Sequence, residues 1–403
     1  MKKNLLIFLY PFNFKYFDYD RYECKYLKKD FQLEIHDFNK ILYPHFMIFN
    51  KENIVNYKFC TSFNTVSEWE KYLNKKITKF NKIGLKIFVL NFIQNDTFSS
   101  FKILRIIKKL KIIRVDIKNP GLPVYSHDLN FLIKNFFDFK YKFKQLIYRS
   151  RYTFENFKII IYRTILKNII RVFYKAKSDF LLVAGRKYIN EIKEKHRIIN
   201  FNTWDYSRFL RFSKYNNFLK DNYAVYLANP GPENISDSQF WKTKHTHTLN
   251  WYKSLNAFFS NIEKKYKLKV VIALHPKAKP EKRHPYLKYR RSYYNKTFEL
   301  VKNSMFVITY DSTSISYAVI YNKPIYFIYS NELKKNPSSL KYSLFLSNML
   351  GSKSINIDEY KVSDLKLLCS KRKYKNYIKD YLTNNKSKKT NYKIISNHLK
   401  KNY

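Results

Sequence analysis

The chain has 403 residues and carries 78 lysines and arginines against 30 acidic residues, which gives a formal charge of +48. Its only 5 glycines are scattered, which excludes the Gly-rich phosphate loops of dinucleotide-binding and P-loop proteins. Hydrophobic residues make up 45% of the chain, enough to bury sizeable cores, and the length suggests about two domains.

The first half of the chain alternates strand patterns with helical patterns. Helical spacing occurs over residues 13–29 and 100–110. Short apolar runs typical of buried strands occur at residues 3–10, 31–36, 86–92, 112–117, 178–184 and 198–201. Because strands that alternate with helices build mostly parallel sheets, this half is expected to be an α/β domain.

The segment 131–175 has a different character, since it is aromatic, basic and helical in period. Its basic residues recur at i, i+4 spacing as one stripe on an otherwise apolar face: Arg163, Lys167, Arg171 and Lys175. Two interpretations remain open. The helix lies on an anionic membrane surface through this stripe, or it is buried in the protein with one basic edge exposed to water.

A polar stretch at residues 214–221 precedes a second α/β series. Strand patterns occur at 223–227, 269–274, 306–310 and 324–329, and helical patterns at 251–266 and 315–321. We therefore expect a Rossmann-like domain over 1–218, a second Rossmann-like domain over 219–368, and a basic helical tail over 369–403.

Polar residues follow two strands of the second series where each strand ends. The strand at 269–274 leads into His275, Pro276 and Lys277. The strand at 306–310 leads into a helix through Asp311, Ser312, Thr313 and Ser314. Ligands of open parallel sheets bind beyond the carboxyl ends of the strands, and imidazole, hydroxyl and helix N-terminal N–H groups bind phosphate. These motifs predict two walls of a phosphate pocket, with ordinary strand-end and helix-capping roles as the alternative.

The stretch from Tyr252 to Tyr329, which contains both motifs, resembles bacterial surface-polysaccharide glycosyltransferases of the GT-B fold. Its His-Pro and Ser/Thr motifs are similar to those of bacterial sialyltransferases and of related capsule and lipopolysaccharide enzymes. The resemblance implies two Rossmann-like domains that face each other across a cleft. It also implies that a nucleotide-sugar donor binds mainly to the C-terminal domain.

The resemblance further implies roles for the motif residues. His275 would bind or protonate the donor phosphate, and Glu332, just after the strand at 324–329, would be placed for the ribose. The remaining donor-binding residues would be Pro276, Lys277, Asp311, Ser312, Thr313 and Ser314. Such groups stabilise the negative charge that develops on the leaving nucleotide. This chemistry needs no metal, and no cofactor is expected beside the donor co-substrate.

The chain departs from the sialyltransferases at the catalytic base. Those enzymes carry an acidic pair followed by glycine, and this sequence contains no such triplet. The base is then expected among Asp18, Asp20 and Asp205, or activity is altered or absent. Asp18 and Asp20 also match the D-x-D metal motif of another glycosyltransferase fold, but they follow the first strand too early for that role, so no metal site is expected.

The sequence thus favours a glycosyltransferase that transfers a sugar from a nucleotide-sugar donor to a surface polysaccharide or lipid-linked glycan. A CMP-sugar is the favoured donor. We expect a cytoplasmic protein that associates peripherally with the anionic inner membrane. The 3 cysteines are far apart in the sequence and form no disulfide pattern, which fits a reducing compartment. No apolar run is long enough to span a membrane.

The alternative is a non-catalytic protein that binds nucleic acid or another polyanion through its positive charge. The charge alone favours this only weakly, because A/T-biased codon usage also produces an abundance of Lys, Asn, Ile, Tyr and Phe. The basic residues are spread along the whole chain, and polyanion binding leaves the two strand-end motifs unexplained.

Overall fold

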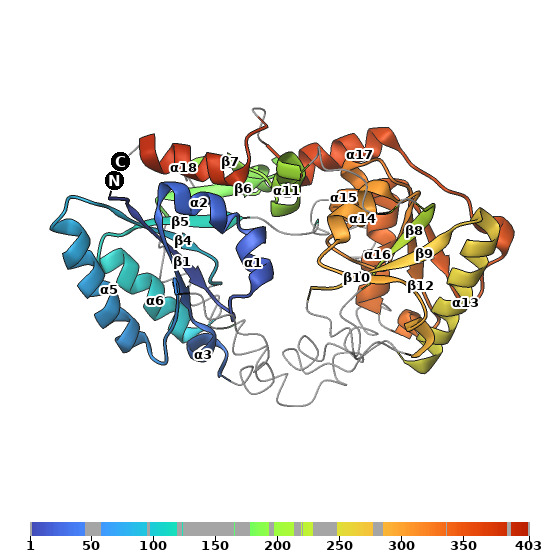
Figure 1. The fold of residues 1–403 in the computed structure, drawn as a ribbon, viewed down its shortest axis with the longest axis horizontal. Coiled ribbons are helices and arrows are strands. Elements are labelled where there is room, and N and C mark those ends of the chain that lie inside the picture. Colours follow the sequence, from blue (N-terminus) through green and yellow to red (C-terminus); the bar gives the residue numbers. More distant parts are fainter. Residues whose placement is uncertain are drawn as a thin grey trace. The chain divides into compact units, whose positions relative to one another are not determined.

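A computed structural model describes residues 2–44, 58–94, 97–118, 123, 165, 178–192, 197–212, 219, 221–228, 248–276, 285–335, 337–384 and 388–401. These residues form two compact units (Figure 1). The first unit takes the described residues between 1 and 119, between 154 and 208, and from 384 onward. The second unit takes those between 120 and 153 and between 209 and 383.

The first unit is built on a seven-stranded sheet in which every pair of neighbouring strands is parallel. In spatial order the strands are β3 (Cys60–Ser62), β2 (Gln32–Asp37), β1 (Leu5–Tyr10), β4 (Ile87–Asn91), β5 (Ile113–Lys118), β6 (Phe180–Ala184) and β7 (Ile198–Phe201). This is the order of a doubly wound Rossmann sheet, which carries helices on both faces. The predicted parallel α/β architecture is confirmed.

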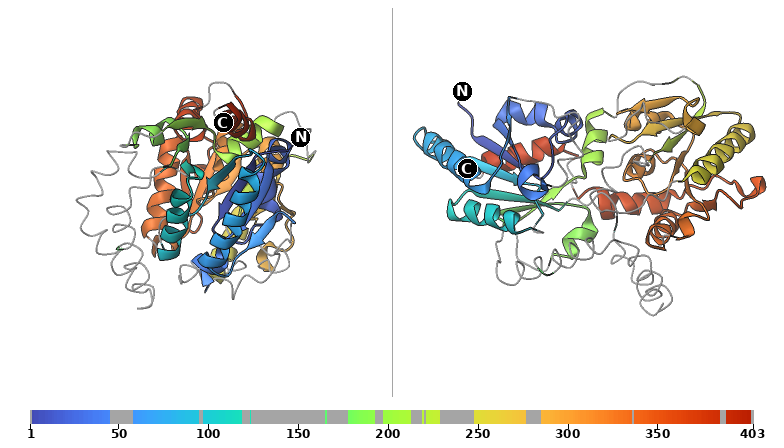
Figure 2. Two further views of the ribbon diagram at one scale, coloured as in Figure 1. Left: turned by 90° about the vertical axis from the view of Figure 1, so that its left-hand side faces the viewer. Right: turned by 90° about the horizontal axis from the view of Figure 1, so that it is seen from below.

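Helices cover both faces of this sheet (Figures 1 and 2). The helices of the first unit are α1 (Tyr16–Arg21), α2 (Cys24–Asp30), α3 (Asn39–Leu42), α5 (Val66–Asn81), α6 (Phe98–Lys109), α10 (Arg186–Asn190) and α18 (Asn391–Lys401), with α11 (Trp204–Phe212) at its boundary. Because both faces are covered, all six residues of β1 are buried. A central strand buried on both sides has a continuous apolar sequence rather than an alternating one.

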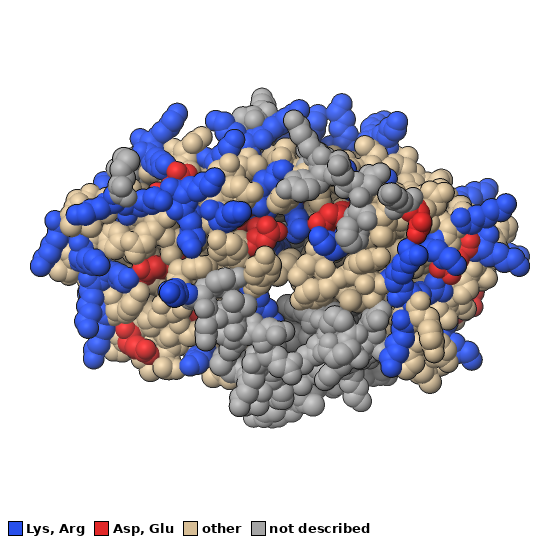
Figure 3. Space-filling view, in the orientation of Figure 1, with Lys and Arg blue, Asp and Glu red and all other residues tan. Residues whose placement is uncertain are grey.

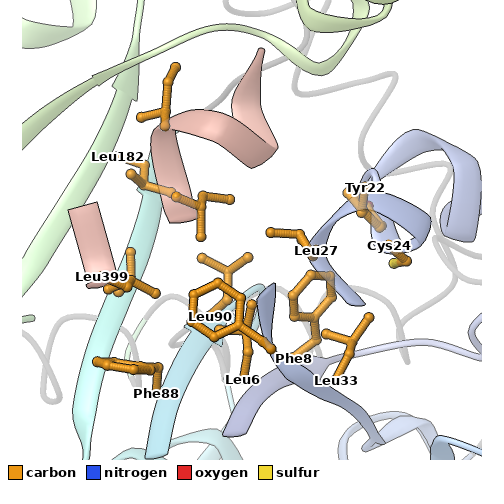
Figure 4. Close-up of a cluster of buried hydrophobic side chains, with 14 of the residues drawn as sticks. Leu6, Phe8, Tyr22, Cys24, Leu27, Leu33, Phe88, Leu90, Leu182 and Leu399 are labelled. Carbon is orange, nitrogen blue, oxygen red and sulfur yellow. The ribbon is translucent and has the colours of Figure 1, made fainter. Parts of the chain in front are cut away.

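The core on one face of the sheet joins segments that are far apart in the sequence (Figure 4). Phe8 of β1, Leu90 of β4 and Leu182 of β6 belong to one buried cluster with Leu27 of α2 and Leu399 of α18. The last helix of the chain is therefore part of the first hydrophobic core. The segment 369–403, which we expected to form one tail, is divided between the two units, because α17 (Lys371–Tyr377) belongs to the second.

Glu23 interrupts the helix that the sequence predicts over residues 13–29. Its backbone is left-handed, with φ 59°, so α1 and α2 are separate helices. Its carboxylate is buried and accepts hydrogen bonds from the Ser207 hydroxyl and from the backbone N–H of Tyr392 in the first turn of α18. The buried charge is therefore fully partnered, and it links α2, α11 and α18.

The second unit contains a six-stranded sheet, which is also entirely parallel. In spatial order its strands are β10 (Ser292–Tyr294), β9 (Lys269–Leu274), β8 (Tyr223–Leu227), β11 (Val307–Thr309), β12 (Ile325–Tyr329) and β13 (Lys353–Asn356). Its other helices are α13 (Leu249–Tyr266), α14 (Thr297–Asn303), α15 (Ile315–Ile320) and α16 (Pro337–Leu350). The strand order repeats that of the first unit, so the chain contains two Rossmann-like sheets.

A buried polar chain connects β2 to α5 in the first unit. The Trp69 indole N–H donates to Nδ1 of His36 at 3.0 Å, so the proton of the neutral imidazole is on Nε2, which donates to Glu34 at 3.4 Å. Lys76 Nζ lies 2.6 Å from the other oxygen of Glu34, and the Tyr72 hydroxyl donates to the same carboxylate at 3.0 Å.

The pKa values of this chain follow from burial and from these bonds. Burial lowers the pKa of His36 although Glu34 opposes it. Burial alone would raise the pKa of Glu34, but the hydrogen bonds from His36 and Lys76 outweigh it and hold the pKa at about 2. In the unfolded chain the two groups return to about 6.5 and 4.5, so unfolding takes up protons below each of these values.

We therefore predict that the stability contributed by His36 and Glu34 decreases as pH falls from about 6.5 towards 2, because at these two groups protons bind the unfolded state preferentially. The substitution Glu34→Gln should destabilise the unit by about 3 kcal/mol at neutral pH and flatten this pH dependence. Hydrogen exchange of residues 32–37 and 66–81 measures the effect. Glu70→Gln on the same helix is the matched control, and a Glu34→Gln protein with the wild-type pH profile would contradict the prediction.

Candidate functional site

The two predicted strand-end motifs leave the second sheet at the same level. Leu227 of β8 pairs with Ala273 of β9 on one side and with Thr309 of β11 on the other. Ala273 and Thr309 are therefore two strand spacings apart, about 10 Å, and His275 and Asp311 each follow two residues later. The strand order also reverses at β8, which is the point where doubly wound sheets bind ligands.

A hydrogen bond from a neighbouring strand holds the turn that contains His275. Tyr294 ends β10 and lies opposite Leu274 in the parallel pairing with β9. Its hydroxyl donates to the backbone carbonyl of Pro276, and both His275 and Pro276 are half-buried. This bond fixes the turn to the end of the sheet. Lys277, the third residue of the motif, lies outside the described residues.

The second motif forms a compact turn between β11 and α15. The backbone N–H of Ser312 donates to the Thr309 hydroxyl at 3.3 Å, and that of Ser314 donates to the Ser312 hydroxyl at 3.2 Å. Ser314 occupies the N-cap position of α15, but its side chain makes no capping bond. Side-chain capping by Ser314 therefore does not explain why hydroxyl residues accumulate here. Thr313 is exposed, and Asp311 is half-buried.

Glu332 lies just beyond the carboxyl end of β12, the strand next to β11. Its carboxylate accepts a hydrogen bond from the hydroxyl of Thr248, the N-cap residue of α13. That hydroxyl makes no capping bond to its own helix. Sequence reasoning missed Thr248, although a threonine directly before a helical pattern is a recognisable signal of a helix start. The pair connects the end of β12 to the helix that follows β8.

In the first unit, α1 and α11 bring together the three aspartates expected to supply a base. Asp20 lies 3.4 Å from Arg208. Arg21 interacts electrostatically with both Asp205 and Asp18. The aspartates therefore share their surroundings with two arginines, which the sequence analysis did not single out. Among the described residues, no group of three or more His, Cys, Asp or Glu side chains is arranged to hold a metal ion.

Asp18 differs from the other two aspartates in its burial. It is 7% exposed, and the backbone N–H of Lys15 donates to its carboxylate at 3.0 Å. Burial raises the pKa of Asp18 although this hydrogen bond and Arg21 oppose it. A raised pKa brings a carboxylate closer to the range in which it accepts a proton efficiently near neutral pH. Burial and the raised pKa distinguish Asp18 as a candidate for the base.

Asp37 is a second buried carboxyl at the same end of the first sheet, and the sequence analysis missed it. It ends β2, opposite Tyr10 of β1, and it is 3% exposed. Burial raises its pKa to about 6, although the backbone N–H of Asn39 donates to it at 2.8 Å. The signal available in the sequence was an acidic residue at the carboxyl end of an apolar strand pattern.

The residues expected to contact a membrane, Arg163, Lys167, Arg171 and Lys175, lie outside the described residues. In the part of the chain that the structure describes, no helix combines the length and the apolar character needed to cross a membrane.

No protein-family model and no curated protein matches the chain. Among solved structures, the calicheamicin glycosyltransferase CalG4 is 8% identical and has a TM-score of 0.50, covering 100% of this chain and 98% of its own. The UDP-GlcNAc 2-epimerase from Methanocaldococcus jannaschii is 14% identical over 100% of both chains, with a TM-score of 0.45. S. aureus MnaA, solved with UDP, is also 14% identical, with a TM-score of 0.45 over 100% and 97%. The likeness to CalG4 shows the fold, which is GT-B-like with two Rossmann-like units.

The Tyr294 hydroxyl gives a direct test of how the His275 turn is held. We predict that Tyr294→Phe costs about 1 kcal/mol, the typical value of one hydrogen bond, and that amide exchange at residues 275 and 276 accelerates. Tyr289→Phe is the matched control, because Tyr289 is 98% exposed in the same unit. Equal exchange rates in the wild type and in Tyr294→Phe would contradict this account of the turn.

Proposed function

We propose that the protein is a glycosyltransferase whose nucleotide-sugar donor binds at the carboxyl ends of β8, β9 and β11. The observation that carries the proposal is the placement of His275 and of the turn 311–314 on either side of β8, where the strand order reverses. An imidazole, hydroxyls and backbone N–H groups at such a point suit a phosphate. CalG4, which shares the fold, is a glycosyltransferase by name.

The donor we favour is a CMP-sugar, because the His-Pro and Ser/Thr motifs are similar to those of sialyltransferases. Glu332, hydrogen-bonded to Thr248 beside β12, is placed to accept a hydrogen bond from a ribose hydroxyl. The acceptor we propose is a surface polysaccharide or a lipid-linked glycan of the capsule or lipopolysaccharide type, reached at an anionic membrane surface.

The division of the proposed reaction between an acceptor-side unit and a donor-binding unit follows from the resemblance to GT-B glycosyltransferases. An acceptor hydroxyl gives its proton to the Asp18 carboxylate, and its oxygen attacks the anomeric carbon of the donor. The bond between that carbon and the phosphate oxygen breaks, and its electron pair stays on the leaving nucleotide. His275 and the hydroxyls of the 311–314 turn stabilise this negative charge, and they do so without a metal ion. Asp37 is the second choice for the base.

Nucleotide binding tests the donor site directly. We predict that CMP, or another of UDP, GDP and TDP, raises the melting temperature of the wild-type chain, because a ligand that binds only the folded state stabilises it. His275→Ala should lose most of this stabilisation. If none of these nucleotides shifts the melting temperature of the wild type, the donor site is wrong.

Asp18→Asn is the matched variant for the other unit. It should keep the nucleotide-induced shift, since Asp18 is assigned to the acceptor, and it should lose sugar transfer. If Asp18→Asn abolishes the shift while His275→Ala retains it, the two assignments are reversed and the proposal fails.

A further inference from the structure

One face of the first unit is rich in exposed basic residues. Seven exposed cations of α5, its C-cap and α6 form what we call the basic face: Lys71, Lys75, Lys79, Lys82, Lys102, Arg105 and Lys109. The acidic residues of these two helices are Glu68 and Glu70 near the start of α5, and the described residues from 71 to 94 and from 97 to 111 include no aspartate or glutamate. In Figure 3, Lys and Arg side chains line the left-hand edge of the view, where Figure 1 draws α5.

Helical spacing directs the basic face away from the sheet. On α5 the cations recur at i, i+4 spacing, and Trp69, Leu73 and Phe80 on the opposite side are buried. On α6 the cations likewise lie opposite the buried Ile103 and Ile107. The two helices pack side by side. Their basic stripes therefore form one continuous, outward-facing surface.

The charge of this surface is not neutralised within the described structure. None of the seven basic-face residues makes an ion pair with another described residue. Lys76 on the same helix behaves differently, because it turns inward to Glu34. Ammonium groups held close together without counter-charges attract anions from solution.

The basic face also contains a shallow depression at the C-terminal end of α5. Its lining residues are Lys75, Thr78, Lys79, Lys82 and Ile83. Three of these residues are lysines, and Ile83 beside them is 40% exposed. Ammonium groups around an exposed apolar side chain suit a phosphate that is attached to an apolar chain.

We infer that the basic face docks onto a bilayer that contains anionic phospholipids. The cations are spread over two adjacent helices rather than along a groove, and all but one are lysines, which act as point charges for scattered phosphates. The exposed aromatic ring of Phe98 beside them is covered by Lys102, and an exposed phenyl ring next to lysines also suits the boundary between headgroups and acyl chains. This inference names the surface that would bring the proposed glycosyltransferase to a membrane, and its biological purpose rests on that proposed function. Its test does not, because vesicle binding is measured without sugar transfer.

Vesicle flotation with the full-length chain tests this inference. The wild type should bind vesicles of equal parts phosphatidylglycerol and phosphatidylcholine, and it should not bind vesicles of phosphatidylcholine alone. The variant K75Q/K79Q/K82Q/R105Q should bind the anionic vesicles about 600-fold more weakly, since each of its four substituted basic residues contributes roughly fivefold near such a surface. Its melting temperature and its response to nucleotides should stay at wild-type values, because the substituted side chains are exposed.

The matched control removes the same number of exposed charges from the second unit, in and just after α17: K371Q/R372Q/K375Q/K379Q. It should bind anionic vesicles nearly as well as the wild type. The inference is overturned if both variants lose binding equally, since the attraction would then be diffuse. It is also overturned if the wild type ignores anionic vesicles, or if the basic-face variant loses only the binding of a single-stranded oligonucleotide. A failed nucleotide response in the wild type would count against the donor site alone.

Discussion

The parallel pairing of β8 with both β9 and β11 is the constraint on which the functional account depends. Parallel strands end at one side of a sheet, and Leu227 is in register with Ala273 and with Thr309. Two motifs that are separate in the sequence therefore leave the sheet at one level, on either side of the same strand. The strand order also reverses there, and in open parallel sheets this is the point at which ligands bind.

The surrounding contacts keep the two motifs in place. Tyr294 holds the His-Pro turn through the Pro276 carbonyl, and Ser312 closes the next turn through its own hydroxyl. In the first unit, burial gives Asp18 and Asp37 a raised pKa while other carboxylates stay paired with arginine or lysine. Carboxyl groups of one unit thus differ in pKa according to their burial and their partners.

Strand patterns predicted most of both sheets, because strands buried on both faces need continuous apolar runs such as those of β1 and β9. The helix α5 was missed. Its apolar residues are few among lysines, and the signal was the cap at Thr65, whose side chain accepts the N–H of Glu68. The break at Glu23 and the packing of α18 on the first unit depend on contacts with Ser207 and Tyr392. Such long-range contacts leave no local pattern.

The central claim is that the carboxyl end of the second sheet binds a nucleotide. Hydrogen exchange of the wild-type chain with and without CMP, UDP and GDP measures this most directly. The account predicts that at least one nucleotide slows exchange in the peptides covering residues 269–276 and 309–316. Slowed exchange confined to the first unit, or no change with any of the nucleotides, would contradict it.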